Sequence, residues 1–300
     1  MSNSPIIVGA GLAGLIAAHA WPQSRVLEAA PQPRAGHRAL LRFRSGAVGQ
    51  LTGIEFRRVQ VRKGLWAEGE FHPPAIRWAN MYAQKVLGRL VGERSIWSLE
   101  PVERFIAPDN FYERLIESVG ARISWATNAS FALKQLMVNT APLPVVLRAL
   151  SLPQPAEFPR APIRVTRWHV PGADVFQTVY FPERCLNVYR ASITCDTLIV
   201  ESIGPLDELD VAEVGRAFGI APDECEELES VEQKYGKIAP IDDEQRKQLL
   251  FRLTHEFNIF SLGRFATWRN ILLDDVVDDI TQIKKLMRSG SAYDIRRAAA

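Results

Sequence analysis

Three glycines near the amino terminus have the spacing of a turn that holds the phosphates of a nucleotide. Residues 6–14 read IIVGAGLAG, so an apolar run leads into Gly9, Gly11 and Gly14. The first glycine allows a tight turn out of a strand, the second lets backbone N–H groups approach a pyrophosphate, and the third lets a helix pack close to that strand. The amino-terminal end of that helix favours an anion. The pattern therefore predicts a dinucleotide site.

An acidic residue stands where the ribose of such a dinucleotide would lie. Glu28 follows a second apolar run and comes 19 positions after Gly9. A carboxylate at the tip of a second strand accepts hydrogen bonds from ribose hydroxyls and repels a 2′-phosphate. FAD or NAD is therefore expected, and NADP is not. The alternative is a glycine-rich turn that binds nothing, but the strand, the helix and the acid together favour a cofactor.

These residues require a strand, a helix and a second strand, and later segments extend this unit into a parallel sheet. A buried strand is expected at 135–141, where an apolar run ends in a turn at Pro142. The remaining elements of this half are a helix that starts at Asp109 and Asn110 and ends near Val119, a strand at 121–125, a helix at 242–256, a strand at 259–262 and a helix at 274–287.

A second type of structure is expected in the middle of the chain. Alternating runs at 163–170, 175–181, 187–194 and 197–201 predict an antiparallel sheet, and a helix should start at Asp207 and end near Phe218. Residues 46–104 show no long helical pattern and are expected to form an insertion of mixed structure. The proline-rich stretch 142–162 is the expected linker.

The predicted fold class is α/β. It consists of an FAD-binding Rossmann-type domain with a parallel sheet and a smaller α+β substrate domain with an antiparallel sheet. Residues 1–45, 105–150 and 250–288 are assigned to the cofactor domain, 46–104 and 155–245 to the substrate or cap domain, and 289–300 to a frayed tail.

Composition limits the class of protein further. The 300 residues are 47% hydrophobic and 23% charged, which suits a protein of two domains. The three cysteines, Cys185, Cys195 and Cys225, have neither metal nor redox spacing, and the five histidines are scattered. No metal site is expected, and reduced thiols and the lack of any membrane-length apolar run indicate a cytoplasmic protein.

The net charge is only +2, yet the stretch from Arg34 to Lys63 is strongly basic, with Glu55 as its one acidic residue. An anionic partner is expected there: the cofactor diphosphate, an anionic nucleotide-type substrate, or nucleic acid. The alternative is a solvated basic face that binds nothing. The oligomeric state does not follow from the sequence.

Two further motifs give the nucleotide-binding pattern a family resemblance. Residues 34–38 read RAGHR, residues 262–268 read LGRFATW, and Leu273-Asp274-Asp275 opens the last helix. Together with the glycine motif, they resemble the flavoprotein amine oxidase and UDP-galactopyranose mutase superfamily. His37 stands where that family usually has a second glycine, and the middle of the chain is only loosely similar.

The resemblance implies noncovalent FAD and assigns residues to it. It places Gly9, Gly11, Gly14 and Arg38 near the diphosphate, Glu28 at the adenosine ribose, and Gly263 and Arg264 at the far end of the cofactor. Backbone N–H groups at the start of the last helix, around Asp274, Asp275 and Val276, would then face the flavin pyrimidine edge. The chain has a single glycine fingerprint, so a second domain for a nicotinamide cofactor is not expected.

Catalytic candidates follow from the segment that resembles the return crossing between the family's domains, Tyr235 to Pro240. Lys237, desolvated beside a flavin, could hold a water near N5, and Tyr235 could form part of an aromatic wall with Trp66, Trp168, Tyr180 and Tyr189. His72 could act as an acid or base. The alternatives are an exposed loop lysine, a structural histidine and aromatic residues of the core.

Three functions remain open. The first is an FAD-dependent oxidoreductase of the amine oxidase type, which oxidises a C–N bond of an amine or amino-acid-like substrate; that amine could be carried on a hypermodified base of phage DNA. The second is a redox-neutral, flavin-dependent mutase that acts on a nucleotide sugar. The third is a flavin-binding protein without turnover.

Overall fold

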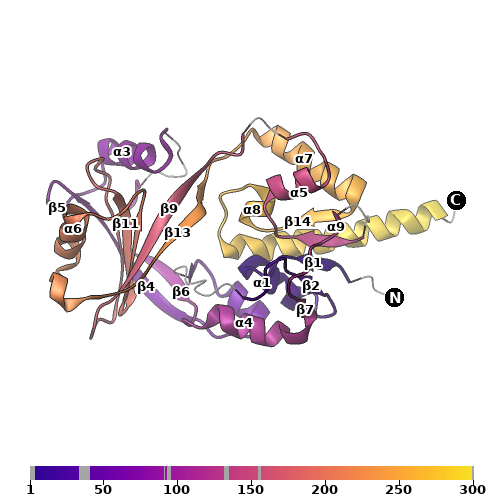
Figure 1. Ribbon diagram of the computed structural model, residues 1–300, viewed down its shortest axis with the longest axis horizontal. Coiled ribbons are helices and arrows are strands. Elements are labelled where there is room, and N and C mark those ends of the chain that lie inside the picture. Colours follow the sequence, from indigo (N-terminus) through magenta and orange to yellow (C-terminus); the bar gives the residue numbers. More distant parts are fainter. Residues whose placement is uncertain are drawn as a thin grey trace. The chain divides into compact units, whose positions relative to one another are not determined.

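The chain forms two compact units, each of which is assembled from separate segments (Figure 1). The computed structural model describes residues 4–33, 41–90, 92, 96–131, 135–154 and 157–298, with the side chains of 222, 234, 235 and 290–298 left out. Unit 1 contains Met1–Arg57, Phe105–Phe158 and Pro240–Ala300, and unit 2 contains Arg58–Arg104 and Pro159–Ala239.

Unit 1 is built on a parallel sheet of five strands. Its order is β14 (Ile259–Ser261), β8 (Met137–Asn139), β1 (Ile6–Val8), β2 (Val26–Leu27) and β7 (Ile123–Ser124). From β1 the chain continues to β2 on one side and later adds β8 on the other. The carboxyl ends of β1 and β8 therefore flank the point where the strand order reverses, which is where open α/β sheets bind ligands.

Helices cover this sheet because their apolar faces must be removed from water. The helix α1 (Leu12–Ala20) is buried along almost its whole length, and Leu15, Ile16 and Ala17 are fully inaccessible. The other elements of unit 1 are α2 (Ala47–Thr52), α4 (Phe111–Val119), the 3-10 turn η2 (Gly120–Arg122), α5 (Leu143–Ala149), α7 (Asp243–Phe257), α8 (Arg264–Thr267) and α9 (Leu273–Ala298), with β3 (Arg42–Phe43) paired to the end of β6 (Val102–Ile106).

Unit 2 is built on a mixed sheet. Its strands are, in order, β13 (Glu226–Ile238), β9 (Arg160–His169), β12 (Thr197–Ser202), β11 (Val188–Cys195), β10 (Val175–Tyr180), β4 (Arg57–Ala67) and β6, and the short β5 (Glu70–Phe71) pairs with β4. All neighbouring strands from β13 to β10 run antiparallel, whereas β4 runs parallel to β10. Three short helical elements complete the unit: α3 (Ile76–Leu87), α6 (Glu208–Phe218) and the 3-10 turn η4 (Pro222–Glu224).

The two faces of the unit 2 sheet differ in chemistry. One face carries the apolar core, in which Val179, Ala191, Leu198 and Val200 pack against α6. The other face carries polar and aromatic side chains, because Tyr180, Arg190 and Glu201 alternate with these apolar residues along the strands. Unit 2 therefore has an apolar face covered by α6 and a polar face, on which Tyr82 of α3 lies against Tyr180.

Several elements differ from those expected. Residues 46–104 contain α3 and the long strand β4, although no long helix was expected there. The segment 226–238 forms β13, and α9 continues to Ala298 where a frayed tail was expected, since residues 289–298 contain no proline to stop a helix. The border between the units lies at Arg57 and Arg58, later than residue 46, because α2 packs against α1 and α9.

Candidate functional site

The glycine turn between β1 and α1 is held from several sides. Gly9 has φ +99°, a conformation that favours glycine, and a Cβ built on Gly14 would lie 1.9 Å from the Gly9 carbonyl oxygen. Thr140, at the end of β8, donates its hydroxyl to the Val8 carbonyl at 2.7 Å and packs against both glycines. Gly9 and Gly14 are therefore required for packing between the strand and the helix.

Gly11 has a different role. It is the N-cap residue of α1 with φ −74°, no side chain caps the helix there, and a Cβ built on it would have no neighbour within 4 Å. The first N–H groups of a helix have no acceptor within the helix, and they carry its partial positive charge. The turn therefore presents an uncapped helix terminus next to open space, which fits a diphosphate.

Glu28 lies beside this turn at the end of β2. Its carboxylate accepts a hydrogen bond from the Ala10 amide at 2.7 Å and another from the Ala30 amide at 2.9 Å. These two bonds fix the side chain next to the glycine turn, while a carboxylate has about four lone-pair positions. Acceptor positions therefore remain on this carboxylate, and its contact with the hydroxyls of a ribose stays a prediction.

The carboxyl-terminal motif meets the amino-terminal one in the same unit. Gly263 has φ +87°, and a Cβ built on it would lie 2.9 Å from the Cβ of Ala13, in the first turn of α1. The amide of Leu262 donates to the Asn139 carbonyl at 2.8 Å, which ties this turn to β8. Nearby, the buried hydroxyl of Ser261 has no hydrogen-bond partner among the described residues. Gly263 and Arg264 thus lie at the same sheet edge as Gly9 and Gly11.

The start of α9 is tied to the segment after β3. Asp274 is 8% exposed, and its carboxylate accepts hydrogen bonds from the amides of Arg44 and Ser45 at 3.0–3.1 Å. Asp275 pairs with the Arg44 guanidinium and accepts from the Leu272 amide, and Val276 is buried in the core. These side chains thus position the helix terminus, and contact between its N–H groups and a flavin stays a prediction.

The basic stretch is divided between the units, since its residues up to Arg57 belong to unit 1 and those from Arg58 to Lys63 belong to β4 of unit 2. Arg44 pairs with Asp275, and Arg58 pairs with Glu103. These two arginines are thus partly neutralised within the chain. Arg34, His37 and Arg38 lie outside the described residues.

Lys237 lies in β13, so the alternative of an exposed loop lysine is wrong. The residue is 5% exposed, and its Nζ lies 4.5 Å from the ring centroid of Tyr189 on the polar face of unit 2. Two residues there, Arg190 and Glu201, form an ion pair that the sequence alone did not reveal, because the two are distant in sequence. The signal that could have found it was the placement of polar residues inside predicted strands.

The other catalytic candidates are placed differently. The Nε2 of His72 donates a hydrogen bond to the Ala67 carbonyl at 3.0 Å, and its ring packs against Trp78, so in this structure His72 stabilises the β4–β5 hairpin. Trp66 and Trp168 lie in the apolar core beside α6, with the Trp66 indole bonded to Glu213 at 2.6 Å. The side chain of Tyr235 lies outside the described residues.

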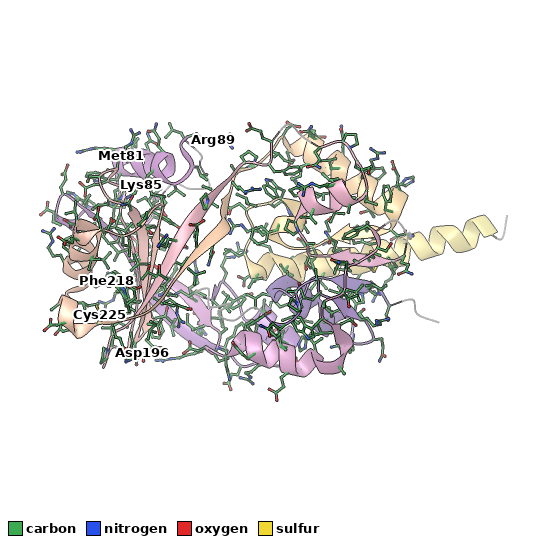
Figure 2. All side chains as sticks on the ribbon, in the orientation of Figure 1. Met81, Lys85, Arg89, Asp196, Phe218 and Cys225 are labelled. Carbon is green, nitrogen blue, oxygen red and sulfur yellow. The ribbon has the colours of Figure 1, made fainter. Side chains whose placement is uncertain are left out.

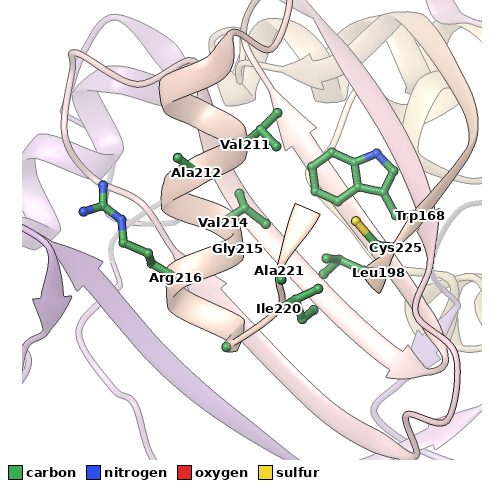
Figure 3. Close-up of a pocket in the computed structure, with 11 residues that line it drawn as sticks. Trp168, Leu198, Val211, Ala212, Val214, Gly215, Arg216, Ile220, Ala221 and Cys225 are labelled. Atoms are coloured by element: carbon green, nitrogen blue, oxygen red, sulfur yellow. The ribbon is translucent and has the colours of Figure 1, made fainter. Parts of the chain in front are cut away.

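A cavity of about 530 Å³ lies between α6 and the sheet of unit 2 (Figure 3). Trp168, Leu198 and Ile220 contribute apolar walls, and the Arg216 guanidinium points away from them to pair with Glu213. Burial raises the pKa of the Cys225 thiol at its edge, assisted by nearby Asp223 and Glu224. The cavity is thus lined mainly by apolar side chains, and Arg216 is turned toward Glu213.

Across the described residues, no cluster of three or more metal-ligating side chains has the geometry of a metal site. Nor does that part of the chain contain a helix with the length and apolarity needed to cross a membrane.

The glycine turn, the parallel sheet and the second sheet unit together define a Rossmann-type α/β fold with an added sheet domain. No protein-family model and no curated protein sequence matches the chain. Reduced UDP-galactopyranose mutase is similar in structure, with a TM-score of 0.65, 14% identity, and coverage of 95% of this chain and 96% of that one. The fold class expected from the sequence is thus confirmed, as is the resemblance at the level of the fold.

Two other solved structures are similar over most of this chain. The tryptophan 5-halogenase MibH has a TM-score of 0.53 and 14% identity, with coverage of 96% of this chain and 67% of that one. The PF1083 protein from Pyrococcus furiosus has a TM-score of 0.51 and 10% identity, with coverage of 93% and 96%. At these identities the similarity describes the fold.

Proposed function

We propose that the protein is an FAD-dependent oxidoreductase of the amine oxidase type, which oxidises a C–N bond of an amine or amino-acid-like substrate. The observation that supports it most is the meeting of two motifs in unit 1. The uncapped start of α1 at Gly11 and the turn at Gly263 lie at one sheet edge, with the Glu28 carboxylate beside them. A long dinucleotide can span such a site from its ribose end to its flavin end.

The residues of unit 1 would hold noncovalent FAD, whose chemistry is to accept a hydride from the carbon next to the substrate nitrogen. The N–H groups at the start of α1 would bind the diphosphate, and Glu28 would accept hydrogen bonds from the ribose. The start of α9, held by Asp274, would stabilise negative charge on the flavin pyrimidine edge. Lys237 and Tyr235 remain the candidates for contact with the reacting centre.

The first test is the visible spectrum of the purified protein, followed by heat release of the cofactor and chromatography against FAD and FMN. Noncovalent FAD predicts a yellow protein that becomes colourless on release. Arg264→Ala should retain less flavin than the wild type. A protein that stays colourless after incubation with excess FAD, while folded by circular dichroism, contradicts the proposal.

The second test distinguishes the substrate classes. The flavin absorption band is followed under anaerobic conditions after mixing with amines, amino acids, nucleotide sugars or amino-modified oligonucleotides. Bleaching by an amine supports the oxidoreductase, and bleaching only by the oligonucleotides supports an amine carried on DNA. Salt-dependent retention on immobilised DNA would accompany the latter.

A redox-neutral mutase is the second candidate, because reduced UDP-galactopyranose mutase is similar over almost the full length of both chains. It predicts no bleaching by any amine and conversion of a nucleotide sugar only after reduction with dithionite. If FAD binds tightly but neither class of substrate reacts under either condition, a flavin-binding protein without turnover is the better description.

A further inference from the structure

The polar face of unit 2 contains a β-bulge that brings consecutive side chains together. Along β11 the pairing with β12 passes from Val188 opposite Ser202 to Arg190 opposite Glu201, so Tyr189 is an extra residue. A bulge directs two neighbouring side chains toward the same part of a sheet. As a result, Tyr189 and Arg190 both reach the carboxylate of Glu201.

The three residues form a fixed, charged network. The Tyr189 hydroxyl donates to Glu201 at 3.0 Å, and the Arg190 Nε donates to the other carboxylate oxygen. Burial opposes ionisation of Glu201, but the charges of Arg190 and Lys237 and the two hydrogen bonds outweigh it and hold its pKa at about 2. Lys237, with its Nζ 4.5 Å from the ring centroid of Tyr189, is a second cation that keeps Glu201 ionised.

The distal side of the Arg190 guanidinium is left for a ligand. Its Nε is occupied by Glu201, but among the described residues no acceptor pairs with Nη1 or Nη2, and the side chain is 36% exposed. Arg190 lies directly opposite Tyr180 in the sheet. The ring of Tyr82 packs against that of Tyr180, with 5.4 Å between the ring centroids. A pre-oriented guanidinium fork thus lies next to aromatic rings, an arrangement that suits a planar oxyanion attached to an apolar group.

We propose that Arg190 binds the carboxylate of the substrate, with Glu201 and Tyr189 as positioning residues that hold the guanidinium in place. This inference deepens the proposed function, because it rests on unit 2 carrying the substrate site. The ionised carboxylate of Glu201 on the other side of the Arg190 guanidinium favours a ligand with a single negative charge. A phosphate dianion would leave uncompensated negative charge next to the buried Glu201.

The test uses full-length protein and isothermal titration calorimetry with three probes: phenylacetate, phenylacetamide and phenyl phosphate. Phenylacetate should bind with 1:1 stoichiometry and more tightly than the other two. Arg190→Gln should weaken it by roughly 10- to 100-fold, since a bond between charged groups is lost. Arg190→Lys keeps the charge next to Glu201 but loses the planar fork of the guanidinium. Its affinity for phenylacetate should therefore lie between those of the wild type and Arg190→Gln.

Arg184→Gln is the matched control, because Arg184 is an exposed arginine on the turn just before β11 and should leave the affinity unchanged. Tyr189→Phe should weaken the binding of phenylacetate less than Arg190→Lys does. If the protein turns over an amino acid, Arg190→Lys should raise KM far more than it lowers kcat.

Several results would overturn the inference: no binding of phenylacetate, stronger binding of phenyl phosphate, or unchanged affinity in both Arg190 variants. The readout does not need flavin, so the two proposals fail separately. Colourless protein that binds phenylacetate through Arg190 contradicts only the FAD function. Yellow protein with unchanged phenylacetate affinity in the Arg190 variants contradicts only the carboxylate site.

Discussion

Gly11 and Gly14 are three positions apart, but a methyl group would meet different surroundings at each. At Gly14 it would collide with the Gly9 carbonyl at 1.9 Å, whereas at Gly11 it would enter open space. Gly14→Ala should therefore lower the free energy of unfolding by about 3 kcal/mol, because the contact between helix and strand must open. Gly11→Ala should change it by less than about 1 kcal/mol yet abolish FAD binding, because its Cβ occupies the phosphate position.

Urea unfolding followed by circular dichroism measures the first effect, and flavin fluorescence titration measures the second. The control is Gly92→Ala, because Gly92 has no positive φ and a Cβ built on it would have no neighbour within 4 Å. Gly53→Ala is unsuitable, because Gly53 has φ +72° and an alanine there would be strained. Equal loss of stability in Gly11→Ala and Gly14→Ala would contradict the assignment of separate roles.

Glu28 provides a test of the ribose contact. A carboxylate can accept from the Ala10 and Ala30 amides at the same time and still accept from a hydroxyl. In Glu28→Gln the amide nitrogen would face one of these donors, so the side chain should turn away and the affinity for FAD should fall about tenfold. Fluorescence titration of the apoprotein with FAD measures this, with Glu55→Gln, at an exposed position, as the control. Equal affinities in the two variants would refute the role of Glu28.

Among the elements, α3 is linked to the β10–β11 turn through one lysine. Lys85 (Figure 2) donates to the carbonyls of Phe181, Glu183 and Val188 at 2.6–2.9 Å, and burial lowers its pKa to about 7 despite the opposing charge of Asp210. An unfolded lysine keeps its proton up to about pH 10.4. Between these values the unfolded chain binds more protons, so the free energy of unfolding should rise with pH across this window.

Lys85→Met removes this titration. Urea unfolding at pH 7, 8 and 9 should therefore show a smaller rise in the free energy of unfolding with pH for the variant than for the wild type. Other titrating groups contribute equally to both proteins and cancel in the comparison. Identical pH dependence would show that Lys85 does not titrate in this window.

The helix α6 begins with a reciprocal cap that also fixes the β10–β11 turn. Asp207 accepts from the Asp210 amide, while the buried Asp210 accepts from the amides of Asp207, Asn187 and Val188. Asp207→Ala should cost about 1 kcal/mol, the usual effect of losing an N-cap. Asp210→Ala should cost about 3 kcal/mol, because three amides lose their acceptor. Urea unfolding distinguishes these two values. Equal losses in the free energy of unfolding for Asp207→Ala and Asp210→Ala would contradict the larger role assigned to Asp210.

The cap at Asp207 could be predicted from the sequence because an acidic residue directly before an amphipathic run is a typical signal of a helix start. The strand β13 could not, since its run of Glu, Gln and Lys residues resembles a solvated loop until it is paired with β9. The strand is stabilised instead by its pairing with β9, across which Glu229 forms an ion pair with Arg167. The burial of Lys237 could not be predicted for the same reason, because it depends on the pairing of β13 with β9.

At the scale of the whole molecule, the glycine turns of unit 1 were predictable because each satisfies a local backbone requirement. Gly9, Gly14 and Gly263 are needed by the chain itself, at a positive φ or a close contact, and such requirements are visible in a short stretch of sequence. The network around Arg190 depends on a bulge and on pairing between distant strands, neither of which leaves a local signal. Sequence thus predicted the glycine turns of unit 1 better than the side-chain network of unit 2.

The division of unit 1 into three chain segments leads to the last prediction. If FAD binds to both ends of that unit, the amides at 11–14 and at 262–267 should gain protection from hydrogen exchange together, although they are far apart in sequence. The N–H groups at the start of α1 lack helical acceptors, so bound phosphate should slow their exchange most. Mass spectrometry with and without FAD measures the exchange of both segments. In Gly11→Ala, FAD should no longer protect the amides of either segment. Protection of one segment alone would mean that the ligand contacts only one end, because one bound molecule must slow exchange wherever it touches.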